Sequence, residues 1–187
     1  MKQINLKLYK IPGILFILLI IIAVSIVLYL GSDKKAQVNK FIIKNGLITN
    51  PADNSIYTGK IVDTVQNKII EYNVVNGLKN GEFIIRYMNG NYQIKGTMKN
   101  NKNTGEWKYY YSSGQLESVG NFKNDLVSDE WTWFYRNGKR KENGVFVNGK
   151  RDGRWNMYDE NGNLKSILYF SQGKIVSKLN AEETKAI

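Results

Sequence analysis

The chain has 187 residues, of which 12 % are aromatic, and a formal net charge of +11 from 27 basic and 16 acidic residues. Because it contains no cysteine and no histidine, disulfides, thiolate metal sites, thiol catalysis and histidine-dependent triads or metal sites are excluded. The aromatic content is too high for a disordered chain, and the positive charge would suit nucleic acid, an anionic lipid or an acidic protein. Most of the basic residues are lysines scattered along the chain, which indicates a solvated surface, so we do not expect a nucleic acid partner.

The N-terminal part of the chain predicts a membrane anchor. Residues 1–10 form a short basic segment, and the following stretch from Ile11 to Leu30 carries no charge. An α-helix of this length, rising ~1.5 Å per residue, would span the ~30 Å hydrocarbon core of a bilayer. No cleavage site with small residues follows it, so we favour an uncleaved transmembrane helix over a signal peptide. Lysines flank both sides, and we place the repeats on the non-cytoplasmic side because an N-terminal span before one large domain usually acts as a signal anchor.

Residues 31–55 are mostly polar and predict a tether between the membrane and the ordered domain. An apolar patch at residues 41–43 indicates at most one short strand, and residues 50–54 have the composition of a turn. We expect the ordered region to begin near Ile56. Residues 177–187 are a C-terminal tail to which we assign no function.

A repeat of 24 residues dominates the region from 56 to 176. An aromatic residue, a glycine seven positions later and an intermediate glycine all recur at this interval. The repeat-defining residues are Phe83, Gly90, Trp107, Gly114, Trp131, Gly138, Trp155 and Gly162, and the intermediate glycines are Gly96, Gly120 and Gly144. Such a period indicates stacked units, with approximate bounds 57–80, 81–104, 105–128, 129–152 and 153–175.

Each unit is predicted to be a β-hairpin. Apolar residues alternate after each aromatic position, as in Trp107, Tyr109 and Tyr111, which is the period of a strand with one buried face. Turn sequences such as Asn137-Gly138 end these runs, because asparagine and glycine accept the positive φ that tight turns need. Since one hairpin is not stable alone, we expect an all-β array of antiparallel hairpins that continue as a meander or solenoid.

Two sets of residues are candidates for a partner-binding surface. Tyr110, Phe134 and Tyr158 recur at the third position after each Trp and form a second aromatic row, which either packs beneath a bent sheet or contacts a partner. Basic residues also gather between positions 136 and 154, where they either bind an anionic partner or protect a sheet edge from pairing. The candidates in this basic cluster are Arg136, Arg140, Lys141, Arg151 and Arg154.

The sequence indicates no catalytic, cofactor or metal site. The acidic pairs Asp129-Glu130 and Asp159-Glu160 are adjacent in strand or turn segments, so their members point to opposite faces and do not resemble the carboxylate dyad of a glycosidase. The glycines mark turns, and none opens a helix as a phosphate-binding loop requires. We therefore expect a binding protein without cofactors and not an enzyme.

The pattern G-x-W-x-x-Y/F-x-x-x-G, followed by a turn rich in Lys and Asn, resembles the bacterial variant of the membrane occupation and recognition nexus (MORN) repeat found in the YwqK-like antitoxin family. The full matches are Gly105, Trp107, Tyr110 and Gly114, and then Gly153, Trp155, Tyr158 and Gly162. The departures are Phe83, Arg86, Asp129 and Phe134. The resemblance covers roughly residues 57–175. It implies an elongated hairpin array that binds or scaffolds without catalysis, and the antitoxin label implies a proteinaceous toxin as partner.

A second resemblance concerns the segment from Trp107 to Gly114. It looks like the aromatic repeats of choline-binding cell-wall proteins, in which rings cage a quaternary ammonium group. The period of those repeats is shorter than the one here, which favours the MORN-like family.

We therefore expect a single-pass protein of the bacterial cytoplasmic membrane. Its repeats would form a protein-interaction or scaffolding module, and an antitoxin-like role is one version of this. The alternative is an envelope module that binds an anionic lipid or a cell-wall polymer through its aromatic and basic surface.

Overall fold

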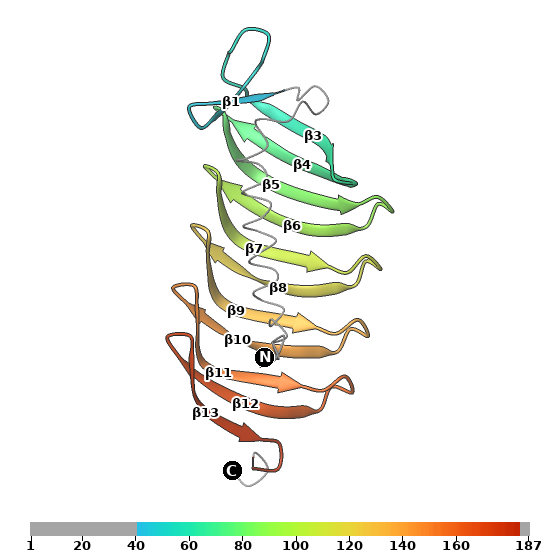
Figure 1. Ribbon diagram of the computed structural model, residues 1–187, viewed down its shortest axis with the longest axis vertical. Helices are drawn as coiled ribbons and strands as arrows, with labels where there is room; N and C mark the ends of the chain where they lie inside the picture. The colour runs from blue at the N-terminus through green and yellow to red at the C-terminus, as the bar shows by residue number, and fades with distance from the viewer. Residues whose placement is uncertain (1–40, 184–187) are drawn as a thin grey trace, which may run out of the picture. The chain divides into compact units, whose positions relative to one another are not determined.

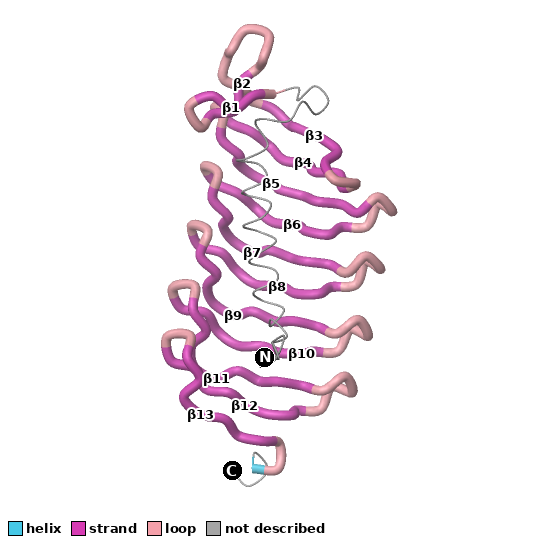
Figure 2. Tube along the Cα trace, viewed as in Figure 1, coloured by secondary structure: helices cyan, strands magenta, loops and turns pink. Residues whose placement is uncertain are grey.

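The computed structural model describes residues 41–183. The predicted membrane helix from Ile11 to Leu30 lies outside the described residues, as do residues 1–10 and the last four residues of the tail. Between residues 41 and 183, no helix is long and apolar enough to cross a membrane. Strands and the turns that join them make up almost all of this region (Figure 2).

One antiparallel sheet of 11 strands contains the repeats. Its strands follow one another in chain order, each paired with the strand before and after it, so the sheet is an uninterrupted meander (Figure 1). The strands are β3 (Gly59–Val65), β4 (Lys68–Val75), β5 (Leu78–Tyr87), β6 (Tyr92–Lys99), β7 (Lys102–Tyr110), β8 (Leu116–Lys123), β9 (Leu126–Phe134), β10 (Arg140–Val147), β11 (Lys150–Tyr158), β12 (Leu164–Ser171) and β13 (Lys174–Asn180). The all-β array of antiparallel hairpins expected from the repeat is confirmed.

A small second sheet precedes the repeats. In it, β1 (Ile42–Lys44) pairs with β2 (Leu47–Thr49), where the sequence predicted a tether with at most one short strand. Ile48 of β2 is buried in one cluster with Ile61 and Val74 of the first unit. The ordered part of the chain therefore begins earlier than expected, because this short hairpin covers apolar residues at the first edge of the array.

Alternation along the strands divides the side chains between two faces of the sheet. We call the face that carries the repeating tryptophans the inner face and the opposite one the outer face. Trp107, Trp131 and Trp155 are only 4 %, 2 % and 0 % exposed. Phenylalanines of the intervening strands meet them edge to face, with centroids 5.4 Å apart for Phe122 and Trp131 and 5.1 Å for Phe146 and Trp155. The core of this array is thus an aromatic ladder on the inner face.

Each of these tryptophan rings rests on a glycine of the preceding strand. A Cβ atom added to Gly120 would approach the ring of Trp131 to 2.0 Å, so no side chain fits at this position. The indole Nε1 of Trp131 donates a hydrogen bond to the carbonyl of Asn121 over 3.1 Å. The same arrangement joins Trp107 to Gly96 and Trp155 to Gly144. This contact explains why the intermediate glycines share the period of the tryptophans.

A bulge in every second strand accompanies this contact. Residues 129–131 of β9 lie opposite the single residue Gly120 of β8, and such a bulge bends the strand. The strands are visibly curved in Figure 1. Asp129 has a φ of 59°, close to the 66° of the equivalent Gly105. Aspartate is one of the few residues other than glycine that tolerate this left-handed conformation, so Asp129 replaces the repeat glycine without changing the local backbone.

The two ends of the array lack the contact between tryptophan and glycine. At the first end, Tyr72 stands at the glycine position and the smaller Phe83 at the tryptophan position, with ring centroids 6.1 Å apart. At the last end, Leu168 stands at the glycine position and pairs in register with Lys178 of β13. Neither end needs a glycine, because neither has an indole ring to accommodate.

Replacing Gly120 with Ala should destabilise the array, because the new methyl group would lie far inside van der Waals contact with the Trp131 ring. We expect the free energy of unfolding to fall by about 1–3 kcal/mol or more, the usual effect of overpacking a core. Urea unfolding of the full chain measures this. The neighbouring Asn121→Ala, on the outer face, is the control and should change the stability by less than about 0.5 kcal/mol. Equal stability of Gly120→Ala and the unmodified chain would show that the ring does not rest on this glycine.

Candidate interaction surfaces

The outer face carries a continuous row of aromatic, apolar and arginine side chains. In each hairpin from β5 to β12, the two residues that face each other across the strands nearest the turn belong to this row. We call these residues the outer row: Arg86, Tyr92, Tyr110, Leu116, Phe134, Arg140, Tyr158 and Leu164. Arg140 is exposed and the others are half-buried. The aromatic row predicted from the sequence is therefore part of a longer strip that crosses eight strands on one face.

At the first end of the outer row, arginine and tyrosine side chains hold one another in place. The guanidinium carbon of Arg86 lies 4.0 Å from the centroid of the Tyr92 ring, and that ring lies 6.0 Å from the ring of Tyr110. The Nε of Arg86 also donates to the carboxylate of Glu71 over 3.0 Å. Hydrogen bonds from Lys60 and Arg86 lower the pKa of Glu71, so this carboxylate stays ionised beside the row.

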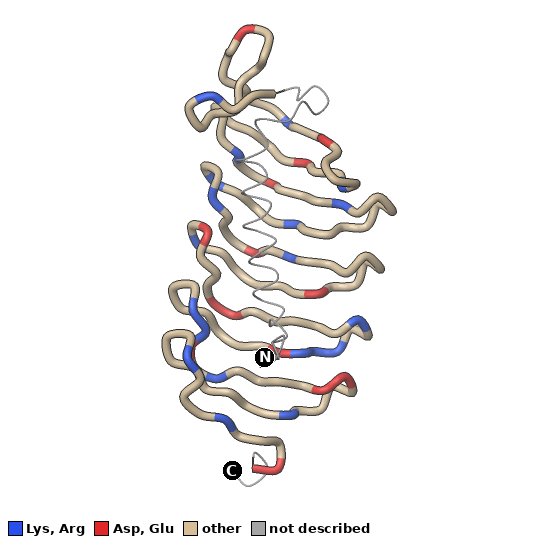
Figure 3. Tube along the Cα trace, in the orientation of Figure 1, with Lys and Arg blue, Asp and Glu red and all other residues tan. Residues whose placement is uncertain are grey.

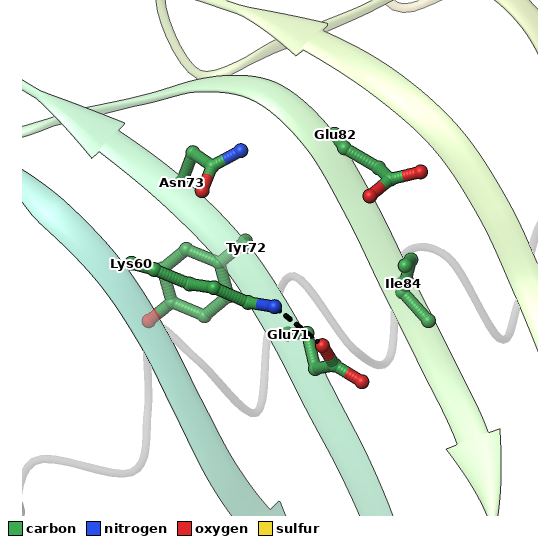
Figure 4. Close-up of a pocket in the computed structure, with 6 residues that line it drawn as sticks. All are labelled: Lys60, Glu71, Tyr72, Asn73, Glu82 and Ile84. Atoms are coloured by element: carbon green, nitrogen blue, oxygen red, sulfur yellow. Dashed lines mark ion pairs between the residues drawn. The ribbon is translucent and has the colours of Figure 1, made fainter.

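A shallow pocket lies next to this end of the row, on β3, β4 and β5 (Figure 4). Lys60 and Glu71 form an ion pair of 2.8 Å within it, as the dashed line shows. Its volume is about 40 Å³, far below the ~300–1,000 Å³ of sites that take organic ligands. The pocket has room for water but not for a substrate.

The basic cluster predicted between positions 136 and 154 does not form one strip. Figure 3 shows basic residues at the turn between β9 and β10 and others at the opposite end of the hairpins, near the start of β11. Arg140 belongs to the outer row, and Arg154 lies on the outer face with its Nε 3.0 Å from the side-chain oxygen of Asn156. Arg136 lies in the turn, with its guanidinium carbon 4.5 Å from the centroid of Tyr111.

Arg151 takes part in the inner-face core. Its guanidinium pairs with Glu142 over 2.9 Å, and the two side chains are only 16 % and 10 % exposed. It also lies 4.0 Å above the ring of Trp155. Burial lowers the pKa of Arg151, and Glu142 opposes this effect. The structure thus gives Arg151 partners within the fold and places it apart from the other arginines of the cluster.

A ladder of tyrosine hydroxyls links successive units at the turn side of the inner face. Tyr87 donates to the carbonyl of Tyr110 over 2.9 Å, and Tyr111 donates to that of Phe134 over 2.7 Å. The third rung is the bond from Tyr135 to the carbonyl of Tyr158, 2.8 Å long. The sequence carries a signal for this ladder, because these tyrosines also recur every 24 residues, although the repeat alone does not show that their hydroxyls bond to the next unit.

Glu117 is a partly buried acid close to this ladder. Glu117 is the unpaired residue of a bulge in β8. Its neighbours Leu116 and Ser118 both pair with residues of β7. Burial raises the pKa of Glu117, and the charges of Arg136 and Lys141 partly oppose the rise. Lys141 lies 5.9 Å from the ring of Tyr135, so the cationic ends of β9 and β10 reach this side of the sheet.

Among the residues that the structure describes, several buried side-chain polar atoms have no hydrogen-bond partner. They are Gln93 Oε1, Tyr109 Oη, Ser118 Oγ and Trp133 Nε1. Burial raises the pKa of Tyr109, so this hydroxyl keeps its proton. Trp133 differs from the repeating tryptophans, whose indole nitrogens all donate to carbonyls. No periodic sequence signal distinguishes these unsatisfied groups.

The acidic pairs are placed as surface and turn residues. The carboxylate of Asp159 accepts hydrogen bonds from the backbone amides of Asn161 and Asn163 over 2.9 and 2.8 Å, which closes the turn after β11 and lowers the pKa of Asp159. Glu130 lies 3.4 Å from the side-chain nitrogen of Asn143 on the outer face. In the part of the chain that the structure describes, no group of three acidic side chains could hold a metal ion.

Three segments of the chain match the family model described as the MORN repeat variant, at residues 103–124, 130–148 and 151–172. No curated protein matches the chain. Among solved structures, a chain of the "Glycosylation Associate Protein (Gap123) complex from Streptococcus agalactiae" aligns with 58 % of this chain at 12 % identity and a TM-score of 0.34. This chain spans only 20 % of the length of that one. The MORN-like resemblance predicted from the glycine and tryptophan pattern is thus confirmed for three repeats.

Replacing Glu117 with Gln should stabilise the fold at neutral pH. Because burial raises the folded-state pKa of this acid, its contribution to stability is fully present below the ordinary pKa of 4.5 and is lost as pH rises through the folded value. The uncharged variant avoids that loss. We expect a higher melting temperature than the unmodified chain at pH 7 and no difference near pH 3, measured by circular dichroism. A lower melting temperature at pH 7 would show that the attraction of Arg136 and Lys141 outweighs burial.

Proposed function

We propose that this chain is a membrane-anchored, non-catalytic interaction module that holds a protein partner on its repeat array. MORN repeats are generally non-catalytic modules for protein or membrane interaction, and three segments match their variant form. The observation that carries the proposal is the outer row, to which each of the eight strands from β5 to β12 contributes one residue at the same end of its hairpin. With strands ~4.8 Å apart, it extends for roughly 34 Å.

The composition of the outer row suits a protein interface. Tyrosine and arginine are the residues that most often dominate binding energy at such interfaces, and this row contains Tyr92, Tyr110 and Tyr158 together with two arginines. The half-buried rings are already held in place by the sheet, so they lose little conformational freedom on binding. An antitoxin-like role would make the partner a proteinaceous toxin, and the support for this finer version is the family resemblance alone.

The alternative function is an envelope module that binds an anionic lipid or a cell-wall polymer. It is favoured by the cations that stand beside rings in the outer row, where Arg140 pairs in register with Phe134 and Arg86 stacks on Tyr92. Such pairs could meet anionic or sugar groups as well as protein side chains.

A variant of the outer row tests the function. We would replace Tyr110, Phe134 and Tyr158 with Ser in the full chain and compare its captured partners with those of the unmodified chain after cross-linking in native membranes. The proposal is supported if the variant no longer captures a specific protein that the unmodified chain captures, while its melting temperature is unchanged. Val145→Ser, which alters an exposed outer-face residue outside the row, is the control and should keep the partner. If the variant captures the same proteins but no longer binds to anionic vesicles or wall material, the alternative function is favoured.

The anchor and its orientation are also proposals. They rest on the uncharged stretch from Ile11 to Leu30, which lies outside the described residues. We expect protease added to intact cells, after permeabilisation of any outer membrane, to digest the repeats, because we place them on the non-cytoplasmic side. Lysed cells are the control for cleavage. Protection until lysis would place the repeats in the cytoplasm, and release of the full-length chain by alkaline carbonate would contradict the anchor.

A further inference from the structure

The β1–β2 hairpin presents isoleucines to solvent at the first end of the array (Figure 1). Ile43 is 66 % exposed, the largest fraction among the exposed large apolar side chains of residues 41–183, and Ile42 is 39 % exposed. Because successive residues of a strand point to opposite faces, these two side chains lie on the two faces of β1. In the described part of the chain β1 pairs with β2 alone, so its other edge is open. The hairpin thus carries an apolar, unpaired edge.

Ile56 adds to this surface. Thr49 pairs with Ile42 on one side and with Ile56 on the other. Paired residues of neighbouring strands share a face, so Ile42 and Ile56 flank Thr49 on one face of the small sheet. Ile56 is 56 % exposed. We call Ile42, Ile43 and Ile56 the end patch.

The fold holds the end patch in place. Ile48, the register partner of Ile43, is only 7 % exposed and is buried in the apolar cluster of the first unit. Its backbone amide donates to the carbonyl of Gly77 over 2.8 Å. The rings of Phe41 and Tyr57 also pack together, with centroids 4.2 Å apart. Some apolar residues of the hairpin are therefore buried against the repeats, and those of the end patch stay exposed on a fixed support.

The chain around the hairpin is basic. Lys44 follows Ile43 in β1, is exposed and has no carboxylate within ion-pair distance among the described residues. An anionic lipid surface attracts such a segment, whereas a second copy of the same segment would repel it. The sequence of residues 34–52 contains no acidic residue and four lysines, which are Lys34, Lys35, Lys40 and Lys44.

The hairpin lies close in sequence to the predicted membrane span. Only ten residues, 31–40, separate the uncharged stretch that ends at Leu30 from the first described residue, Phe41. A segment of this length reaches at most ~36 Å when fully extended. The proposed anchor would therefore keep the hairpin near the bilayer, where even a weak contact is favoured by the high effective concentration.

We propose that the end patch and Lys44 contact the interface of the bilayer in which the chain is anchored. The three isoleucines would enter the boundary between headgroups and acyl chains, and the ammonium group of Lys44 would meet anionic headgroups. Since the hairpin is fixed to the first unit, this second contact would set the direction in which the repeats leave the membrane surface. The inference rests on the proposed anchor, but it concerns a surface separate from the outer row.

The test uses spin labels, because a chain without cysteine can carry one at a single chosen site. Ile43→Cys places a nitroxide in the end patch. Val145→Cys, at an exposed apolar residue of β10, is the matched control. It lies seven strands from β3, ~34 Å along the array.

The full chain is reconstituted in vesicles of phosphatidylglycerol and phosphatidylethanolamine, and an alkaline carbonate wash removes chains without an anchor. Electron paramagnetic resonance then measures how often each label collides with oxygen, which concentrates in lipid. It also measures collisions with a nickel chelate, which stays in the water on both sides of the bilayer. At residue 43 the nickel collision rate should be severalfold lower, and the oxygen rate higher, than at residue 145. Adding Lys44→Glu should restore nickel contact at residue 43, because anionic headgroups repel the new charge.

Three results would overturn the inference. The first is an equal nickel rate at the two labelled sites, which would leave residue 43 in water. The second is a low rate for both reagents at residue 43, which would mean that protein covers the patch. The third is an unchanged nickel rate with Lys44→Glu. An unanchored chain is lost in the wash and no partner protein is present, so failure here is distinguishable from failure of the anchor and of the outer-row experiment.

Discussion

The contact between an indole ring and a glycine one strand away is the interaction on which the rest of the array depends. Between residues 41 and 183 the repeats form one open sheet, in which the rings of one strand are covered by residues of the strands on either side. Gly120 allows the Trp131 ring to lie against the backbone itself, and the hydrogen bond to the carbonyl of Asn121 fixes the ring's direction. The bulge beginning at Asp129 supplies the bend that brings ring and glycine together. Glycine, bulge and ring therefore form one structural unit.

This packing gives the two faces of the sheet different roles. The inner face is occupied by the aromatic ladder, by the ion pair of Arg151 with Glu142 and by the tyrosine hydroxyls that tie one unit to the next. The outer face also buries side chains, Ile84 and Ile167 among them, but the outer row takes no part in the aromatic ladder. The composition of the outer row is therefore not fixed by the packing of the core. For this reason the aromatic and arginine residues of the outer row are stronger candidates for recognition than the rings of the core.

The 24-residue period made the fold predictable from the sequence. The candidate sites were harder to predict, because they depend on residues that do not follow this period. The 24-residue spacing of Trp107, Trp131 and Trp155 indicated hairpins and their boundaries, and the alternation placed Tyr110 on the opposite face. The basic cluster could not be placed, because residues close in sequence lie at opposite ends of a hairpin when a strand separates them, as β10 separates Arg136 from Arg151. The unsatisfied Ser118 could not be found either, since satisfaction of a buried hydroxyl depends on neighbours from other strands.

The departures at Tyr72 and Leu168 also bear on how such a chain can change its length over evolution. Between them, every unit presents the same glycine on one side and the same indole on the other, so an additional copy arising by tandem duplication would find matching neighbours on both sides. Past Leu168 an added unit would meet a branched side chain where its indole must lie. The gene can therefore gain or lose internal units as whole multiples of 24 residues, whereas growth at the C-terminal end first requires a leucine to become glycine.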